Sequence, residues 1–210
     1  MQIKTLPLGK LGVNCYLISS EKAAVVIDPA IYDKRIEDFL IQNANKERLI
    51  LLTHCHFDHI GGAEVLRNNT GVKIAIGENE AASLLDTEIT LSNRFHAHIA
   101  PFNADITLKD GKTLNIGDFE ILCVETKGHT IGGMCYKIGN ALFSGDTLFK
   151  LSVGRVDFPG GNANELILSL NKIKNLFEDI EVNPGHGEAT TLKFEKIYNP
   201  YLKGDGEYLL

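Results

Sequence analysis

Apolar residues recur along the chain in short segments, and their spacing predicts secondary structure. Alternating or continuous apolar runs bounded by glycine or charged residues indicate β-strands, whereas apolar residues three or four positions apart indicate helices. Strands are predicted at residues 3–8, 15–19, 23–27, 49–52, 72–76, 119–124, 135–138, 141–144 and 180–182. Helices are predicted at residues 33–42, 60–68, 79–85 and 162–177. The alternation of strands with helices indicates an α/β fold.

Two of these helices have clear starting signals. Asp33 is expected to be the N-cap of the first helix, because its side chain can accept a hydrogen bond from the first turn. Asn162 and Glu165 form a start that resembles a capping box at the last helix. That helix repeats its apolar residues at the helical period, at Leu166, Leu170, Ile173 and Phe177.

Three predicted strands run directly into a polar side chain of a kind that binds metals. Leu52 is followed by His54, Phe143 by Asp146, and Val182 by His186. In open α/β sheets, sites gather beyond the carboxyl ends of strands, where loops present side chains without disturbing the core. The sequence therefore predicts that several ligand types meet at one edge of the sheet.

The length and the net charge of the chain restrict the classes of function that it can have. The 210 residues, 44% hydrophobic and 23% charged, suit a single domain spanning 1–210. The net charge of -6 comes without a basic stripe, which disfavours nucleic acid and favours a small-molecule substrate. The chain has no apolar run long enough for a membrane span, and residues 1–7 lack the core of a signal peptide. A cytoplasmic protein with no membrane partner is expected.

The four cysteines are expected to be free thiols. They show no C-x-x-C spacing, and Cys15, Cys123 and Cys135 lie in apolar, strand-like runs. Cys55 lies inside the histidine-rich motif, where its side chain is expected to point away from the ligands.

The segment His54-Cys55-His56-Phe57-Asp58-His59 carries the strongest chemical signal. In an extended segment, residues i and i+2 point the same way, so His54 and His56 can bind one metal together. Asp58 and His59 follow where the chain turns toward a glycine pair and can face a second metal. This pattern arises by chance in roughly one of two thousand sequences of this composition. A metal site is therefore favoured over a polar loop.

Further candidate ligands each stand beside a glycine. They are His129 in Gly128-His129-Thr130, Asp146 in Ser144-Gly145-Asp146-Thr147, and His186 in Pro184-Gly185-His186-Gly187. One such histidine would be a weak signal. Together with the first motif, they account for five of the seven histidines and coincide with strand ends.

These motifs, in this order, resemble the metallo-β-lactamase fold superfamily along essentially the whole chain. The resemblance implies a four-layer αβ/βα sandwich with the metal site at the edge of two sheets. It implies two divalent metals, zinc foremost, with iron or manganese as alternatives. It places His54, His56 and His129 on one metal. It places Asp58, His59 and His186 on the other, with Asp146 bridging.

Within the superfamily, the chain is similar to short, single-domain members of the glyoxalase II-like group. The motifs that carry this likeness are Asn14-Cys15-Tyr16, Val26-Ile27-Asp28-Pro29, residues 153–161 and the stretch from Thr190 to Pro200. The likeness implies hydrolysis of a small thioester such as S-lactoylglutathione by a hydroxide shared between the metals, with Asp58 orienting that nucleophile. The longer enzymes of this group have an additional C-terminal helical domain, and after the last histidine a tyrosine that contacts glutathione. This chain instead reads Gly187-Glu188 after that histidine and ends at Leu210.

Other functions remain open at this point. A persulfide dioxygenase of the same superfamily would hold one iron with His54, His129 and Asp146. Lactonase, β-lactamase and non-catalytic metal-binding roles are lesser alternatives.

Arg155 and Lys150 are candidate contacts for the carboxylate of an anionic thioester, since arginine in particular binds carboxylates with two parallel hydrogen bonds. Phe158 is expected to line the cleft. His96 and His98 form an H-x-H pair without the following Asp-His, so they are predicted to lie outside the site.

Overall fold

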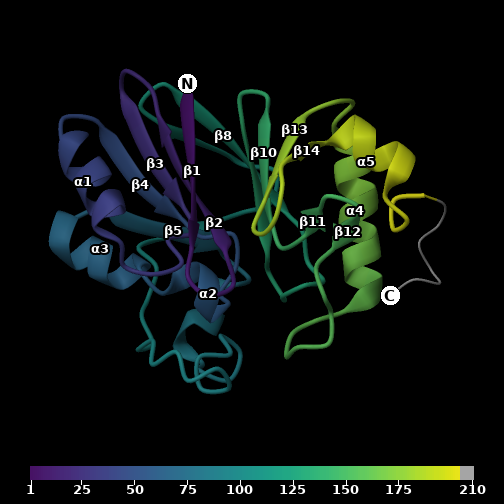
Figure 1. The fold of residues 1–210 in the computed structure, drawn as a ribbon, viewed down its shortest axis with the longest axis horizontal. Coiled ribbons are helices and arrows are strands. Elements are labelled where there is room, and N and C mark those ends of the chain that lie inside the picture. The colour runs from purple at the N-terminus through teal and green to yellow at the C-terminus, as the bar shows by residue number, and fades with distance from the viewer. Residues whose placement is uncertain (204–210) are drawn as a thin grey trace.

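Two β-sheets form the centre of the molecule, and helices cover their outer faces (Figure 1). The computed structural model describes residues 1–203. Seen from one side to the other, the layers are helices α1 and α3, the first sheet, the second sheet, and helices α4 and α5. This arrangement confirms the predicted four-layer αβ/βα sandwich.

The first sheet has six strands in the order β1-β2-β3-β4-β5-β6. The first three strands pair in antiparallel fashion and the remaining pairs are parallel. Their bounds are β1 Gln2–Leu8, β2 Val13–Ser19, β3 Ala23–Ile27, β4 Glu47–Leu51, β5 Lys73–Gly77 and β6 Ile106–Leu108. All the predicted strands of this half are confirmed, whereas β6, at only three residues, was not predicted.

The second sheet also has six strands, in the order β14-β13-β10-β9-β8-β7. They are β7 Thr113–Ile116, β8 Phe119–Glu125, β9 Met134–Ile138, β10 Ala141–Gly145, β13 Glu181–Pro184 and β14 Thr190–Thr191. A separate two-stranded sheet pairs β11 Leu148–Phe149 with β12 Ser152–Val153. The parallel pairing of β10 with β13 brings the residues that follow them to one end of the sheet.

The helices are α1 Lys34–Gln42, α2 Phe57–Ile60, α3 Ala63–Thr70, α4 Ala163–Leu176 and α5 Leu192–Tyr198, with a 3-10 helix η1 at Ala81–Leu85. Both predicted caps are confirmed. The Asp33 side chain accepts from the Arg35 N–H, and the Asn162 side chain accepts from the Glu165 N–H. Among the helices of residues 1–203, none has the length and apolar character needed to cross a membrane.

The prediction of one helix over residues 60–68 was wrong, because two helices, α2 and α3, meet at Gly61-Gly62. The backbone of the β3–α1 connection presses against this glycine pair. A Cβ atom on Gly61 would lie 2.4 Å from the Ala30 carbonyl oxygen, and one on Gly62 would lie 2.4 Å from that of Ile31. The close packing anchors α2, which carries two of the predicted ligands, against the first sheet.

Three apolar clusters fill the three spaces between the four layers. On β3, side chains alternate between them, as Val26 packs with Ile36 under the outer helices while Ile27 packs with Phe143 between the sheets. Leu170 of α4 belongs to the third cluster, on the far side of the second sheet.

All four cysteines are buried and free, as predicted. Cys55 belongs to the first cluster and is therefore directed away from the ligands.

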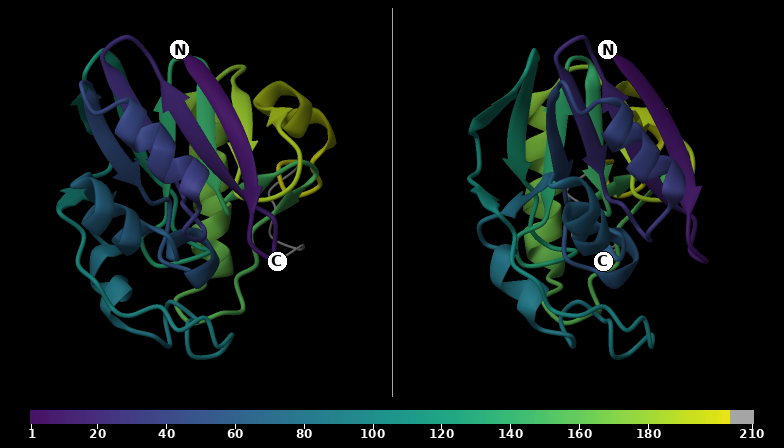
Figure 2. Two further views of the ribbon diagram at one scale, coloured as in Figure 1. Left: turned by 60° about the vertical axis from the view of Figure 1, so that its left-hand side comes forward. Right: turned by 90° about the vertical axis from the view of Figure 1, so that its left-hand side faces the viewer.

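Long connections gather at the end of the molecule that carries α2. Figure 2 shows there both the segment between η1 and β6 and the segment between β12 and α4. These two segments come from opposite halves of the sandwich. They form the rims of the site described next.

Candidate metal centre

All seven predicted ligands lie at this end of the two sheets, each just beyond a strand. His54 and His56 follow β4, and Asp58 and His59 lie in α2; His129, Asp146 and His186 follow β8, β10 and β13 respectively. Both sheets contribute, which explains why ligands far apart in sequence can meet. The expectation drawn from the strand ends is thus met by the positions of the side chains.

The donor atoms converge into three overlapping groups, within each of which they lie no more than 4.8 Å from one another. We name His54, His56 and His129 the three-histidine group, and Asp58, His59 and His186 the mixed group. The remaining group joins His54 and His59 to Asp146. Such clusters of His and Asp donors suit a divalent metal.

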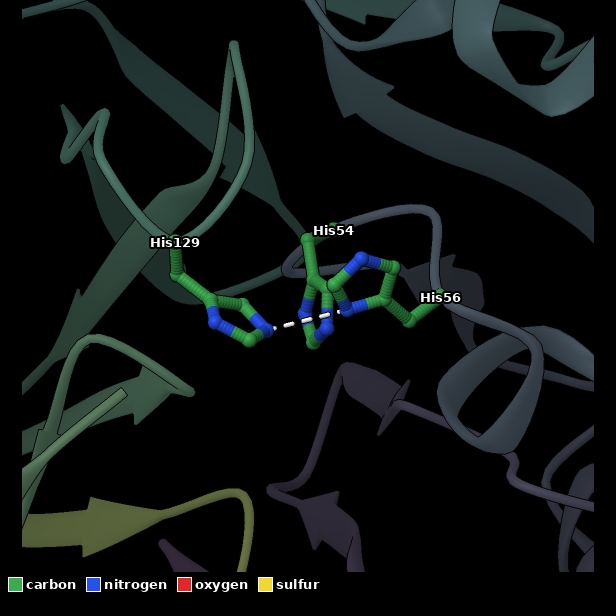
Figure 3. Close-up of side chains that lie close together, drawn as sticks. All are labelled: His54, His56 and His129. Carbon is green, nitrogen blue, oxygen red and sulfur yellow. Dashed lines mark hydrogen bonds between the residues drawn. The ribbon is translucent and has the colours of Figure 1, made fainter. Parts of the chain in front are cut away.

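In the three-histidine group the imidazole rings face a common point (Figure 3). The His129 Nε2 atom lies 2.9 Å from the His56 Nδ1 atom. The ring centre of His54 lies 4.7 Å from that of His56 and 4.9 Å from that of His129, with the ring planes nearly perpendicular in both pairs. All three residues are buried.

Asp146 lies between the two groups. Its Oδ1 atom is 3.4 Å from the His59 Nε2 atom, and its Oδ2 atom is 3.6 Å from His129 Nε2 and 3.5 Å from His186 Nε2. One carboxylate thus reaches histidines of both groups, as the bridging role predicted for it requires. A glycine makes room for it, since a Cβ atom on Gly185 would lie 2.2 Å from Asp146 Oδ1.

Hydrogen bonds at the outer nitrogen orient several of these rings. The Nδ1–H of His129 donates to the Arg155 carbonyl at 2.7 Å, and that of His186 donates to the Leu11 carbonyl at 3.1 Å. Because a carbonyl oxygen can only accept, Nδ1 carries the proton, and the Nε2 atom faces inward with a lone pair that can bind a metal. Such support fixes the tautomer that binds metal.

His186 is also held by its backbone. It forms a β-bridge with Val13, and the side chain of Asn14 donates to the carbonyl oxygens of Pro184 and Gly187 on either side of it. The N-terminal hairpin therefore positions the last predicted ligand.

Asp28 is a functional residue that sequence reasoning did not identify as part of the site. It is buried, and its carboxylate accepts from the His59 Nδ1 atom at 2.9 Å, the Thr53 N–H at 2.8 Å and the Thr53 hydroxyl at 2.7 Å. The Thr53 oxygen in turn lies 3.0 Å from His54 Nδ1. Asp28 directly follows β3, so the rule of strand ends could have indicated it.

The buried polar atoms test whether a metal fits. Within residues 1–203, His54 Nε2, His56 Nε2, His59 Nε2 and Asp146 Oδ1 are buried without a hydrogen-bond partner. Unsatisfied buried polar atoms are costly, and their presence in one cluster indicates a bound ion. The donor set and these orphaned atoms therefore fit a divalent metal.

The protonation states agree with that fit. Burial lowers the pKa of His54 well below its ordinary value and lowers the pKa of His56 to about 3, so both imidazoles are neutral. Burial disfavours a charged His59, but the surrounding Asp146, Asp58 and Asp28 carboxylates raise its pKa well above the ordinary value. Three carboxylates around one histidine favour a cation at this position, whether proton or metal.

A cavity of about 460 Å³ opens over the ligands. Its floor includes His56, Asp58, His129, Asp146 and His186, and its walls are mainly apolar, with Leu11, Phe57, Phe95, Phe149 and Phe158. A second cavity of about 330 Å³ adjoins it and shares Leu11, Phe57, Asp58 and Phe95. The arrangement of convergent polar groups below apolar walls is typical of a small-molecule site.

The three predicted substrate contacts differ in whether they line the larger cavity. Phe158 lines the larger cavity, with its ring centre 5.9 Å from that of His56. Arg155 also lines it, but one edge of its guanidinium, formed by Nε and Nη2, donates two hydrogen bonds of 2.6 Å to Asp157. Lys150 lines neither cavity and pairs instead with Glu188, in contrast to the role expected for it.

His96 and His98 lie outside the metal-ligand groups, as predicted, although His96 lines the second cavity.

Comparison with known proteins identifies the family. Residues 8–186 match the family model of the metallo-beta-lactamase superfamily. A probable metallo-hydrolase, YqgX, from Bacillus subtilis is 31% identical over 97% of this chain and 99% of its own length. The hydroxyacylglutathione hydrolase GloC of Haemophilus influenzae is 33% identical over 96% of this chain and 98% of its own.

Solved structures agree. The BLEG-1 B3 metallo-beta-lactamase superimposes with a TM-score of 0.86 at 35% identity, covering 97% of this chain and all of that one. TTHA1623 in a di-iron-bound form gives 0.80 at 31% identity, covering 95% of this chain and all of that one. ETHE1 from Myxococcus xanthus gives 0.78 at 27% identity, covering 99% and 88%. The fold, the ordered motifs and these matches lead to one conclusion: the chain belongs to the metallo-β-lactamase superfamily.

Proposed function

We propose that this protein is a metal-dependent hydrolase of small anionic thioesters, with two divalent metals held by the three-histidine group, the mixed group and Asp146. The observation that carries the proposal is the convergence of these donors on the floor of one apolar cavity. A bound metal pair would supply Lewis-acid activation of water and of the acyl carbonyl. The similarity to GloC, a hydroxyacylglutathione hydrolase, supports a thioester as the substrate.

The chain's own residues suit this chemistry. Asp58 lines both cavities, and its Oδ2 atom lies 3.4 Å from the His186 Nε2 atom, which holds the carboxylate toward the cavity. Burial opposes ionisation of Asp58, but His59 and His186 outweigh it and hold the pKa of this carboxyl below its ordinary value. Asp58 is thus an anion that can accept a hydrogen bond from the attacking water. A thiolate leaving group, with a thiol pKa of about 8.5, needs little proton donation.

The aromatic walls supply the rest of the site. The rings of Phe57 and Phe95 stack with centres 4.9 Å apart, and Phe95 meets Phe158 edge to face at 6.1 Å. These rings give an apolar surface for the acyl and thiol parts of a substrate and limit the access of bulk water. In this proposal zinc is the metal, although the related TTHA1623 was solved with two irons.

The test combines metal analysis with a substrate panel on the same preparation. Zinc- and iron-loaded protein are assayed with S-lactoylglutathione, a coenzyme A thioester, a lactone, a β-lactam and glutathione persulfide, with Asp146→Asn as the inactive control. About two metals per chain and thioester hydrolysis are expected. One iron per chain with oxygen-dependent turnover of the persulfide, and no thioester hydrolysis, would establish the dioxygenase instead. Preferred turnover of the β-lactam or the lactone would equally overturn the proposal.

A further inference from the structure

Two arginines from opposite halves of the sandwich meet at one aromatic ring. The Arg155 Cζ atom lies 4.0 Å from the ring centre of Phe158, and the Arg94 Cζ atom lies 5.2 Å from it. Arg94 belongs to the segment between η1 and β6, and Arg155 and Phe158 belong to the segment between β12 and α4. Phe158 therefore lies where the two rims of the cleft meet, and both guanidinium groups lie close to its ring.

The guanidinium groups of Arg155 and Arg94 differ in how many of their N–H groups are already hydrogen-bonded within the protein. The Nε and Nη2 atoms of Arg155 donate to the two carboxylate oxygens of Asp157. Arg94 is exposed, and no carboxylate within residues 1–203 lies close enough to form an ion pair with it, although its charge adds to the larger effect of Arg155 in lowering the pKa of the nearby Asp157 carboxyl. Two guanidinium groups thus lie near one ring, with the Asp157 carboxylate beside them, on a chain whose net charge is -6. A guanidinium with a free planar fork is suited to a carboxylate.

The position is also right for the distal part of a substrate. Phe158 lines the cavity on one side and its ring lies 5.9 Å from that of His56, a predicted ligand. Arg94 does not line the cavity, so an anion at its guanidinium would lie beyond the Phe158 ring. A molecule whose reacting carbonyl lies over the ligands could reach Arg94 only with a group several bonds away. That group belongs to the thiol carrier or to a long acyl chain.

We propose that Arg94 is a specificity-determining residue that binds a carboxylate of the substrate at the rim of the cleft, outside the cavity in which the thioester is cleaved. Arg155 supports this subsite as a second cation, and Asp157 weakens it by competing for Arg155. The inference rests on the proposed function in one respect only, the identity of the bound molecule as a thioester. The carboxylate subsite itself follows from the rim residues.

Binding without hydrolysis separates the two claims. The probe is S-hexylglutathione, a thioether that cannot be hydrolysed, and the comparison ligand is its diethyl ester, in which both carboxylates are masked. Titration calorimetry on metal-loaded protein gives the affinities. Arg94→Gln is expected to weaken binding of the free acid about tenfold, the size of one lost charge-assisted contact, and to change binding of the diester by less than twofold. Asp157→Asn is expected to tighten binding of the free acid, because it releases the Arg155 fork.

Two further variants serve as controls. Arg35→Gln removes an arginine that pairs with Asp33 on α1, away from the cleft, and should leave both affinities unchanged. Lys10→Gln removes a cation that lines the second cavity.

The outcomes are distinct. Equal affinities of Arg94→Gln and the parent protein for the free acid would overturn the proposal. Loss of affinity in Lys10→Gln instead would do so as well, and would move the anion to the second cavity. Failure of the parent protein to bind the free acid more tightly than the diester would also overturn it. If binding behaves as expected but no thioester in the panel is hydrolysed, the carboxylate subsite stands and the proposed function fails.

Discussion

The three-histidine group and the mixed group lie side by side but differ in burial and charge. The first consists of three buried imidazoles. The second includes a carboxylate, and two of its members are partly exposed, with 27% of the His186 side chain and 15% of the Asp58 side chain accessible. Each group has one histidine that donates to a backbone carbonyl, His129 in the first and His186 in the second, but in the mixed group the carboxylate of Asp28 holds His59 directly.

This difference suggests a division of labour within the proposed centre. Buried imidazole ligands favour retention of a metal. An exposed position with an anionic ligand favours access for water and substrate, and a metal there exchanges more readily. We therefore expect the two positions to differ in affinity, with the buried one the tighter. The following experiments test that contrast, beginning with the residue that the two groups share.

Asp146→Asn is expected to give the largest effect. The substitution removes negative charge from the carboxylate whose oxygens lie within 3.6 Å of histidines of both groups, so binding at both proposed metal positions should be weakened. Activity should fall on the order of a thousandfold, beyond the 10–100-fold typical of residues that merely support a ligand. Elemental analysis and turnover measure this, with the exposed Asp118→Asn as a matched control. A smaller loss than that of Asp58→Asn would contradict the shared role.

His129→Ala and His186→Ala form the direct comparison of the two groups. We expect His186→Ala to retain about one metal per chain after dialysis against a weak chelator, because the buried group is intact. His129→Ala should lose metal from the buried position under the same dialysis. Activity should fall on the order of a hundredfold or more in both variants. Equal metal retention in the two variants would show that burial does not set the order of affinity.

Much of this centre could be predicted because each ligand follows a strand and has a distinctive residue type. His54, His129 and His186 are far apart in sequence, but each follows a strand that ends at the same end of the two sheets. Asp28 obeys the same rule, yet its role depends on a contact with His59, and a single aspartate gives no sign of its partner. Lys150 shows the reverse case, since only tertiary structure reveals that Glu188 engages it.

The elements that escaped prediction are mostly short. β11, β12 and β14 have two residues each, too few to show any period. Helix α5 is seven residues long and was not predicted. The predicted helix over residues 60–68 divides at Gly61-Gly62 because of a backbone contact with Ala30 and Ile31, which no local pattern records.

Asp28→Asn is expected to have an intermediate effect, concentrated on the mixed group. An amide in place of the carboxylate cannot accept from all three donors, His59 Nδ1 and the two Thr53 groups. Metal affinity should fall about 10–100-fold. Metal titration checks this, with the thermal unfolding midpoint as a measure of folding and Asp38→Asn, at a half-buried position on α1, as the control. Unchanged affinity would show that His59 does not depend on this carboxylate.

Lys150→Ala is expected to have the smallest effect. Its ammonium pairs with Glu188 at the surface and lines neither cavity, and exposed ion pairs contribute about 0–1 kcal/mol. KM and kcat for the preferred thioester should therefore change by less than twofold. A severalfold rise in KM would restore Lys150 as a substrate contact and extend the functional surface beside His186.

The attachment of His186 to the N-terminal hairpin affects the order in which the candidate site can assemble during synthesis of the chain. Asn14 reaches the Pro184 carbonyl across 170 positions of the sequence. On the ribosome, the three-histidine group is complete in sequence once residue 129 has been synthesised, whereas the mixed group must wait for residue 186. A growing chain can therefore assemble the ligands of the buried position first. The mixed group is complete only when the segment around His186 docks on the N-terminal hairpin, so the last predicted ligand to be synthesised is held by the first hairpin to be synthesised.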